Sequence, residues 1–190
     1  ALVKMSFLCA CRLMGNDEEK PMTGFAHNIR GASSVAIAAV QKSLDAGDLV
    51  IACDGINCYN TLNRLPAFTY VSKRRTKFAP IIPLLNLLYA RKGVAIAYDT
   101  DGFPIYKTPV TTGTRQGCTS ATLFFEFSTI EFSAKFFKKM VQVVDDIHLI
   151  GSNTLQIFPE VLSEGLKVGL DLRGPKLHGI CFREGADFQT

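Results

Sequence analysis

Two adjacent aspartates, Asp145 and Asp146, lie between two short runs of mostly β-branched residues, and this arrangement constrains the fold more than any other feature of the chain. The flanking runs, 141–144 and 147–150, are typical of paired strands, which places both aspartates on the two-residue turn of a hairpin. Such a turn favours Asn-Gly or Asp-Gly because its central residues adopt positive φ, and neighbouring carboxylates repel each other. The pair is therefore explained either by a cation bound above it or by a solvated acidic turn.

A second acidic position follows an apolar run. Residues 49–53 predict a buried strand that ends at Asp54, and an aromatic residue, Tyr59, follows five positions later. Asp54 and Gly55 alone would indicate a turn. The polar residues that follow predict a loop or a short helix in place of a returning strand.

A glycine-bracketed loop lies between these two acidic positions. Gly113 and Gly117 enclose a short polar segment that contains Arg115 and Gln116. Ser120 is placed to cap a helix through the phenylalanine-rich segment that follows. Loops of this kind allow a backbone to approach a ligand closely.

The order of these motifs resembles the palm of reverse transcriptases, and the chain is most similar to the enzymes of non-LTR retrotransposons. In that family an aspartate followed by an aromatic residue, a Gln-Gly motif and a strand–Asp-Asp–strand box occur in the same order. The segment "GLKVGLDLRGPK", which ends near Lys176, resembles a fourth family element. The small-residue helix before Asp54 is similar to the lead-in of the non-LTR enzymes. The resemblance covers roughly residues 20–185.

The resemblance implies an α+β fold: a polymerase palm, with an antiparallel sheet and helices on one face, plus a partial fingers region. Residues 1–48 would form the partial fingers and residues 49–190 the palm, with the thumb absent. The predicted elements agree with this order. They are an opening strand at 2–14, a helix at 34–46 that Gly47 ends, a helix at 80–91, a hairpin of 94–98 and 103–110, a helix at 155–168 and a last strand at 178–182.

The resemblance also implies the catalytic acids and their cofactor. Asp54 and Asp145 would be ligands of two Mg²⁺ ions, and Asp146 would be the supporting acid. Magnesium prefers hard oxygen ligands, and two metal ions can clamp the attacking and leaving oxygens of a phosphoryl transfer.

Five further positions match the family's site residues, four of them as substrate contacts and Lys176 as a further catalytic residue. Tyr59 corresponds to the aromatic gate that excludes a 2′-hydroxyl. The alternative interpretation is that Tyr59 is an ordinary half-buried tyrosine without a role in the site. Gln116 and Gly117, preceded by Arg115, correspond to the loop that lies against the template base and the incoming nucleotide. Lys176 corresponds to a lysine that helps to neutralise the leaving pyrophosphate, and its alternative is a solvated surface lysine.

Two functions remain open. The first is an RNA-directed DNA polymerase core that needs an RNA template, a DNA primer, deoxynucleoside triphosphates and the remainder of a longer polypeptide to supply a thumb. The second is a catalytically inactive module that is a structural part of a ribonucleoprotein. Val143 stands where the family usually has Tyr or Phe, and the interval from Gly117 to Asp145 is short, which favours the second function. The intact acids favour the first.

The amino-acid composition narrows the partners, metal sites and compartments that remain possible. With 190 residues, 47% of them hydrophobic, the chain can bury a sizeable core, and its net charge of +4 suits a polyanion partner. The six cysteines form no Cys-x-x-Cys pair, which argues against a zinc site. Cys53 and Cys118 lie inside the motifs, so a reducing, intracellular compartment is expected, with nucleus and organelle not distinguished. No apolar run approaches the ~20 residues of a membrane span.

Overall fold

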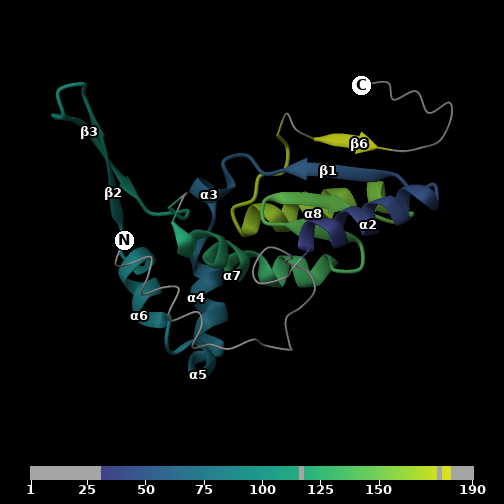
Figure 1. The fold of residues 1–190 in the computed structure, drawn as a ribbon, viewed down its shortest axis with the longest axis horizontal. Helices are drawn as coiled ribbons and strands as arrows, with labels where there is room; N and C mark the ends of the chain where they lie inside the picture. The colour runs from purple at the N-terminus through teal and green to yellow at the C-terminus, as the bar shows by residue number, and fades with distance from the viewer. Residues whose placement is uncertain (1–30, 116–117, 175–176, 181–190) are drawn as a thin grey trace.

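The computed structural model describes residues 31–115, 118–174 and 177–180 (Figure 1). Their central element is a four-stranded antiparallel sheet with the order β4-β5-β1-β6. The strands are β1 (Val50–Asp54), β4 (Met140–Val143), β5 (Asp146–Leu149) and β6 (His178–Ile180). The α+β architecture with antiparallel pairing confirms the expected fold class.

Two long helices cover the inner face of this sheet. They are α7 (Thr119–Phe136) and α8 (Thr154–Lys167). Side chains alternate between the faces of a strand, so Ile147 and Leu149 of β5 point into the core, where both are fully buried. Phe124 and Phe125 of α7 are also fully buried there. Burial of these large apolar groups on one face is the main force that holds α7 against the sheet.

Helix α2 (Ala32–Asp45) lies against the other side of the edge strand β4. Ala36 of α2 packs on Val141, with Val143 and Ile150 beside them. Val141 and Val143 alternate along β4 with the residues that face the core. The expected helix at 34–46 is therefore confirmed, and Gly47 follows it with a φ of 78°.

A helical region leads from the sheet to a separate hairpin. Its elements are α3 (Cys58–Thr61), α4 (Arg64–Lys73), α5 (Arg75–Phe78), α6 (Ile82–Leu85) and the π-helical turn η1 (Asn86–Ala90). Strands β2 (Gly93–Tyr98) and β3 (Pro104–Val110) then form a two-stranded sheet. Figure 1 shows this hairpin projecting away from the central sheet.

Three expectations about the helices differ from the structure. Helix α4 has no counterpart among the predicted elements, although Asn63 caps it by accepting a hydrogen bond from the Leu65 amide (3.0 Å) and Pro66 follows in its first turn. Ser120 does not cap α7: the helix begins at Thr119 after Cys118, and the buried Ser120 hydroxyl instead shares a hydrogen bond with Tyr89 (3.0 Å). The predicted helix at 80–91 is divided into α6 and η1.

The predicted opening strand at 2–14 lies outside the described residues, as do most of the expected fingers. Within the described ranges no helix is long and apolar enough to cross a membrane.

Candidate active site

Two of the three predicted catalytic acids face each other across neighbouring strands. Asp54 ends β1 and Asp146 begins β5, and they are directly opposite in the antiparallel register. Opposite residues of such a pair have Cα atoms about 4.5–5.5 Å apart, with their side chains on the same face. The sheet therefore brings together two carboxylates that are far apart in the sequence.

The hairpin turn is shifted by one residue from its predicted position. Val143 pairs with Asp146, so the two-residue turn consists of Val144 and Asp145 and not of the two aspartates. Asp146 belongs to the strand because the pairing that buries Ile147 extends one further residue. As a consequence Val144 adopts a φ of 56°, a left-handed conformation that costs roughly 1–2 kcal/mol for a residue with a Cβ.

A buried glutamine supports this strained turn. The side-chain amide of Gln142 donates a hydrogen bond to the Val144 carbonyl (2.7 Å). Gln142 is only 2% exposed, and its side-chain oxygen accepts a hydrogen bond from the Ser133 hydroxyl on α7. Gln142 is not among the site residues predicted from the sequence, where its signal is a polar residue within an apolar strand. The turn that carries Asp145 is thus tied to the main core helix.

The thiol of Cys58, at the start of α3, is affected by the negative charges of Asp145 and Asp54. The pKa of this thiol is raised from 9.0 to about 12, mainly by burial and in smaller part by the negative charges of Asp145 and Asp54. Burial alone raises the pKa of Cys53 to about 11. The charges of Asp54 and Asp145 therefore act on one common thiol, which belongs to the first turn of α3. The cysteines at 53, 58 and 118 are free thiols.

Tyr59 follows Cys58 on α3 and is half-buried. Its ring contacts that of Phe125, with centroids 5.3 Å apart, and burial raises the pKa of its phenol. Asn57, which precedes this short helix, has a φ of 48°. The left-handed residue turns the chain so that α3 begins directly after the strand that carries Asp54.

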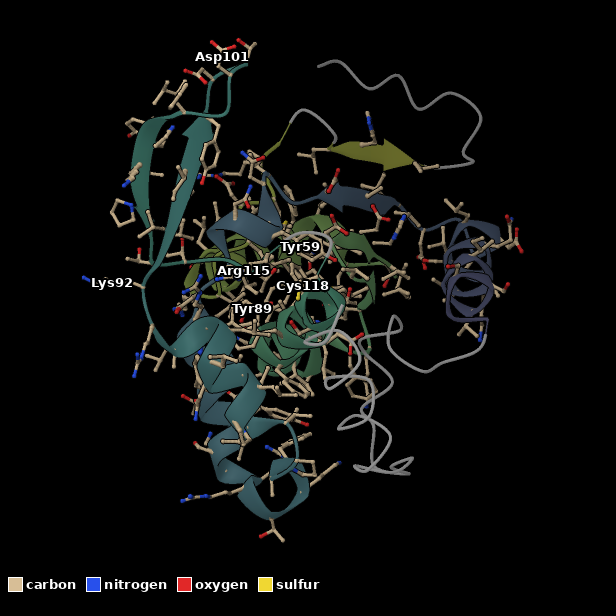
Figure 2. All side chains as sticks on the ribbon, turned by 60° about the vertical axis from the view of Figure 1, so that its left-hand side comes forward. Tyr59, Tyr89, Lys92, Asp101, Arg115 and Cys118 are labelled. Carbon is tan, nitrogen blue, oxygen red and sulfur yellow. The ribbon has the colours of Figure 1, made fainter. Side chains whose placement is uncertain are left out.

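Of the predicted loop residues, Arg115 is exposed and lies just before α7 (Figure 2). Gln116 and Gly117 lie outside the described residues. The loop approaches the helix of Tyr59, because the Thr114 amide donates a hydrogen bond to the Tyr59 carbonyl (2.5 Å).

The segment of residues 165–174, which resembles the fourth family element, packs along the chain that follows Asp54. The Ile56 amide donates to the Asp171 carbonyl (2.8 Å), and the Thr61 hydroxyl donates to the Gly169 carbonyl (2.8 Å). A Cβ built on Gly174 would lie 2.9 Å from Ile56, so only glycine fits there without displacement. Lys176 itself lies outside the described residues.

The donor atoms of the predicted metal site are carboxylate oxygens, which are the ligands that Mg²⁺ prefers. The described part of the chain contains no group of three or more His, Cys, Asp or Glu side chains that could hold a metal ion. Two carboxylates nevertheless suffice for Mg²⁺ when substrate phosphates and water supply the other ligands. Asp54, at the end of β1, and Asp145, in the turn next to the opposed Asp146, offer two carboxylates for such a site.

No protein-family model and no curated protein matches the chain. Its fold is similar to that of solved telomerase structures. Apo telomerase from Candida tropicalis, truncated from its C-terminal domain, aligns with a TM-score of 0.65 at 14% identity and covers 98% of this chain. Telomerase from Candida albicans in complex with a fragment of telomeric RNA aligns with a TM-score of 0.62 at 13% identity and covers 94%.

The chain spans less than half the length of these structures, 41% of the first and 35% of the second. Telomerase is related to reverse transcriptases, so the expectation of a reverse-transcriptase-like fold is confirmed.

Proposed function

We propose that this chain is the palm of a reverse transcriptase of the non-LTR retrotransposon type, which adds deoxynucleotides to a DNA primer on an RNA template. One observation carries the proposal: in a reverse-transcriptase-like fold, Asp54 lies directly opposite Asp146, with Asp145 in the adjoining turn. Directly opposed carboxylates are destabilising unless a cation neutralises them. A nucleotidyl-transfer site supplies the reason for keeping them together.

Asp54 and Asp145 would hold two Mg²⁺ ions, and Asp146 would add negative charge from the neighbouring position. When bound, the metal ions would activate the primer 3′-hydroxyl and neutralise charge on the leaving pyrophosphate. Gln142 keeps the Asp145 turn in place through its hydrogen bond to the Val144 carbonyl. Fixed placement of the carboxylates lowers the reorganisation needed during the reaction.

The substrate contacts complete the proposed site. Tyr59 would lie beneath the sugar of the incoming nucleotide and exclude a 2′-hydroxyl. Arg115, Gln116 and Gly117 would face the template base and the nucleotide, and Lys176 would approach the pyrophosphate.

Nucleic acid would be the main partner. Two similar telomerase structures contain a fragment of telomeric RNA, which supports RNA as a ligand of this fold. The similar structures are more than twice as long as this chain, which supports a further segment that would supply a thumb. The buried thiols of Cys53 and Cys58 suit a reducing, intracellular compartment.

The proposal is tested by primer extension with the full-length protein on an RNA template, with Mg²⁺ and deoxynucleoside triphosphates. Extension that stops when Mg²⁺ is chelated, or in an Asp54→Asn variant, is the expected result. A folded protein that binds RNA but does not extend a primer would support the second candidate, a structural module of a ribonucleoprotein. Val143 favours that candidate, because it replaces the family's usual aromatic residue before the Asp-Asp box.

A further inference from the structure

Arg64, the first residue of α4, makes four hydrogen bonds to backbone carbonyl oxygens. Its Nε donates to Gly113 (2.7 Å) and its Nη2 donates to Thr112 (2.9 Å). Its Nη1 donates to Tyr89 (3.3 Å) and Arg91 (3.5 Å). Hydrogen bonds from a charged donor are about twice as strong as those between neutral groups. This side chain is therefore committed to an intramolecular contact.

The four carbonyls belong to both roots of the β2–β3 hairpin. Tyr89 and Arg91 precede β2, whereas Thr112 and Gly113 follow β3. An isolated two-stranded hairpin is marginally stable in water. Figure 1 shows that this hairpin projects from the body of the molecule, so its orientation depends on how its roots are held. A single guanidinium joins the two roots to each other and to α4.

The second root also contacts the helix that carries Tyr59. The Gly113 amide donates to the Leu62 carbonyl (2.8 Å), and the Thr114 amide donates to the Tyr59 carbonyl (2.5 Å). Gly113 has a φ of 71°, and a Cβ at this position would overlap the carbonyl oxygens of Tyr59 and Asn60. Only glycine therefore permits this close approach.

The chain continues from this root directly into the loop of Arg115. The Arg64 guanidinium lies over the Tyr89 ring, 5.7 Å from its centroid. The Tyr89 hydroxyl shares a hydrogen bond with the Ser120 hydroxyl on the far side of that loop (3.0 Å). The loop is thus held at its start by Arg64 and at its end by Tyr89.

We propose that Arg64 is a positioning residue: it fixes the hairpin root against α3 and thereby sets where the loop of Arg115 stands relative to Tyr59. This inference rests on the proposed function, since both elements would contact the incoming nucleotide. Lysine cannot replace Arg64, because an ammonium group lacks the planar fork of five donors that reaches carbonyls on two segments. Loss of the fork is expected to weaken nucleotide binding more than the chemical step.

The first test compares Arg64→Lys with Arg91→Lys. Arg91 is an exposed arginine at the same root, and its carbonyl remains available in the variant. Hydrogen exchange in the full-length protein is expected to accelerate at the Gly113 and Thr114 amides in Arg64→Lys only, with the β5 amides unchanged. The KM for deoxynucleoside triphosphate should rise about tenfold, the equivalent of one good hydrogen bond, with kcat less affected.

A second pair of variants displaces the root without changing Arg64. Gly113 and Gly102 both have positive φ, but a Cβ at Gly102 meets no atom within 4 Å. Gly113→Ala should therefore raise KM as Arg64→Lys does, whereas Gly102→Ala at the hairpin tip should not.

Unchanged exchange at Gly113 and Thr114 in Arg64→Lys would overturn the inference. Lost protection throughout the molecule, including β5, would also overturn it, because Arg64 would then be a general stabiliser. Local loosening with an unchanged KM would refute the nucleotide-positioning role. A wild-type protein without polymerase activity would instead refute the proposed function and with it that role, while exchange would still decide whether Arg64 anchors the hairpin.

Discussion

Asp54 lies directly opposite Asp146 in the register of strands β1 and β5. Like charges in this arrangement destabilise an antiparallel pair by an amount on the order of 0.2–1 kcal/mol. A cation held by Asp54 and Asp145, as proposed, would also reduce this repulsion.

Magnesium is expected to raise the melting temperature of the protein. At a concentration of about 100 times its Kd, a ligand that binds only the native state stabilises it by ~2.7 kcal/mol. Thermal denaturation with and without Mg²⁺ measures the shift, which should be lost in Asp54→Asn. Asp101→Asn, an exposed aspartate in the β2–β3 turn, should keep it. An equal shift in both variants would place the ion elsewhere.

Asp145→Asn should abolish primer extension while leaving the fold intact. It removes one charge that would hold the metal ions, and losses of several kcal/mol of transition-state stabilisation reduce the rate by about a thousandfold or more. The free energy of unfolding should stay the same or rise slightly, because the repulsion with Asp146 is removed. Single-turnover extension and urea denaturation measure the two effects. A destabilised but active variant would show that the pair is structural.

Tyr59→Ala should relax discrimination between deoxyribonucleotides and ribonucleotides. The phenol ring would no longer block the 2′-hydroxyl, so the ratio of kcat/KM values for the two sugars should fall. Tyr70→Ala is the matched control, because Tyr70 is also half-buried and packs on Phe78 and Phe127. Both variants lose aromatic packing, but only the first should change sugar selectivity. The same selectivity in an active Tyr59→Ala enzyme would reject the gate.

Gln142→Leu should destabilise the protein and slow extension together. The Val144 carbonyl would lose its Gln142 partner, which costs about 1–3 kcal/mol for a group left unsatisfied. The Ser133 hydroxyl would keep its hydrogen bond to the Thr129 carbonyl (3.0 Å). Ser133→Ala removes one contact of Gln142 but leaves the hydrogen bond to Val144 in place. Extension by Ser133→Ala should therefore exceed that of Gln142→Leu by about tenfold, the equivalent of ~1.4 kcal/mol. Equal activities would show that the turn does not depend on Gln142.

Stability should decline in alkaline solution through the buried thiols. The folded-state pKa of Cys58 is raised from 9.0 to about 12, so the native state holds this proton more tightly than the unfolded state. The resulting contribution is fully present below pH 9 and is lost as the pH rises towards 12, by up to about 1.4 kcal/mol per pH unit. Urea denaturation without divalent cations measures this slope, which should be shallower in Cys58→Ala. Parallel slopes would contradict the assignment.

Much of the architecture follows from local patterns in the sequence. Apolar alternation predicts β5, the small-residue segment before Gly47 predicts α2, and the turn residues at 99–102 predict the β2–β3 hairpin. These signals are local because the burial of one face fixes the period of a helix or strand. Helix α4 also has a local signal, the cap at Asn63, although the predicted elements do not include this helix.

The candidate site depends on pairing that no local pattern encodes. The sequence indicates that Asp54 ends a strand and that two acids lie near a turn, but the opposition of Asp54 and Asp146 arises only when β1 joins β5. The same pairing draws Asp146 into the strand and forces Val144 to a φ of 56°. A one-residue change in a turn is invisible in the sequence, because it is decided by how far the ladder continues.

The sequence by itself thus determined the type of most elements and supplied the candidate acids, since hydrophobic period and side-chain chemistry are properties of short segments. Tertiary structure alone decided the roles of Arg64 and Gln142. Arg64 contacts carbonyls up to 49 positions away, and Gln142 contacts Ser133 on another element. Their functions are set by partners that only folding brings within hydrogen-bonding distance. Every residue carries a backbone carbonyl, so the sequence does not show which carbonyl a side chain will contact.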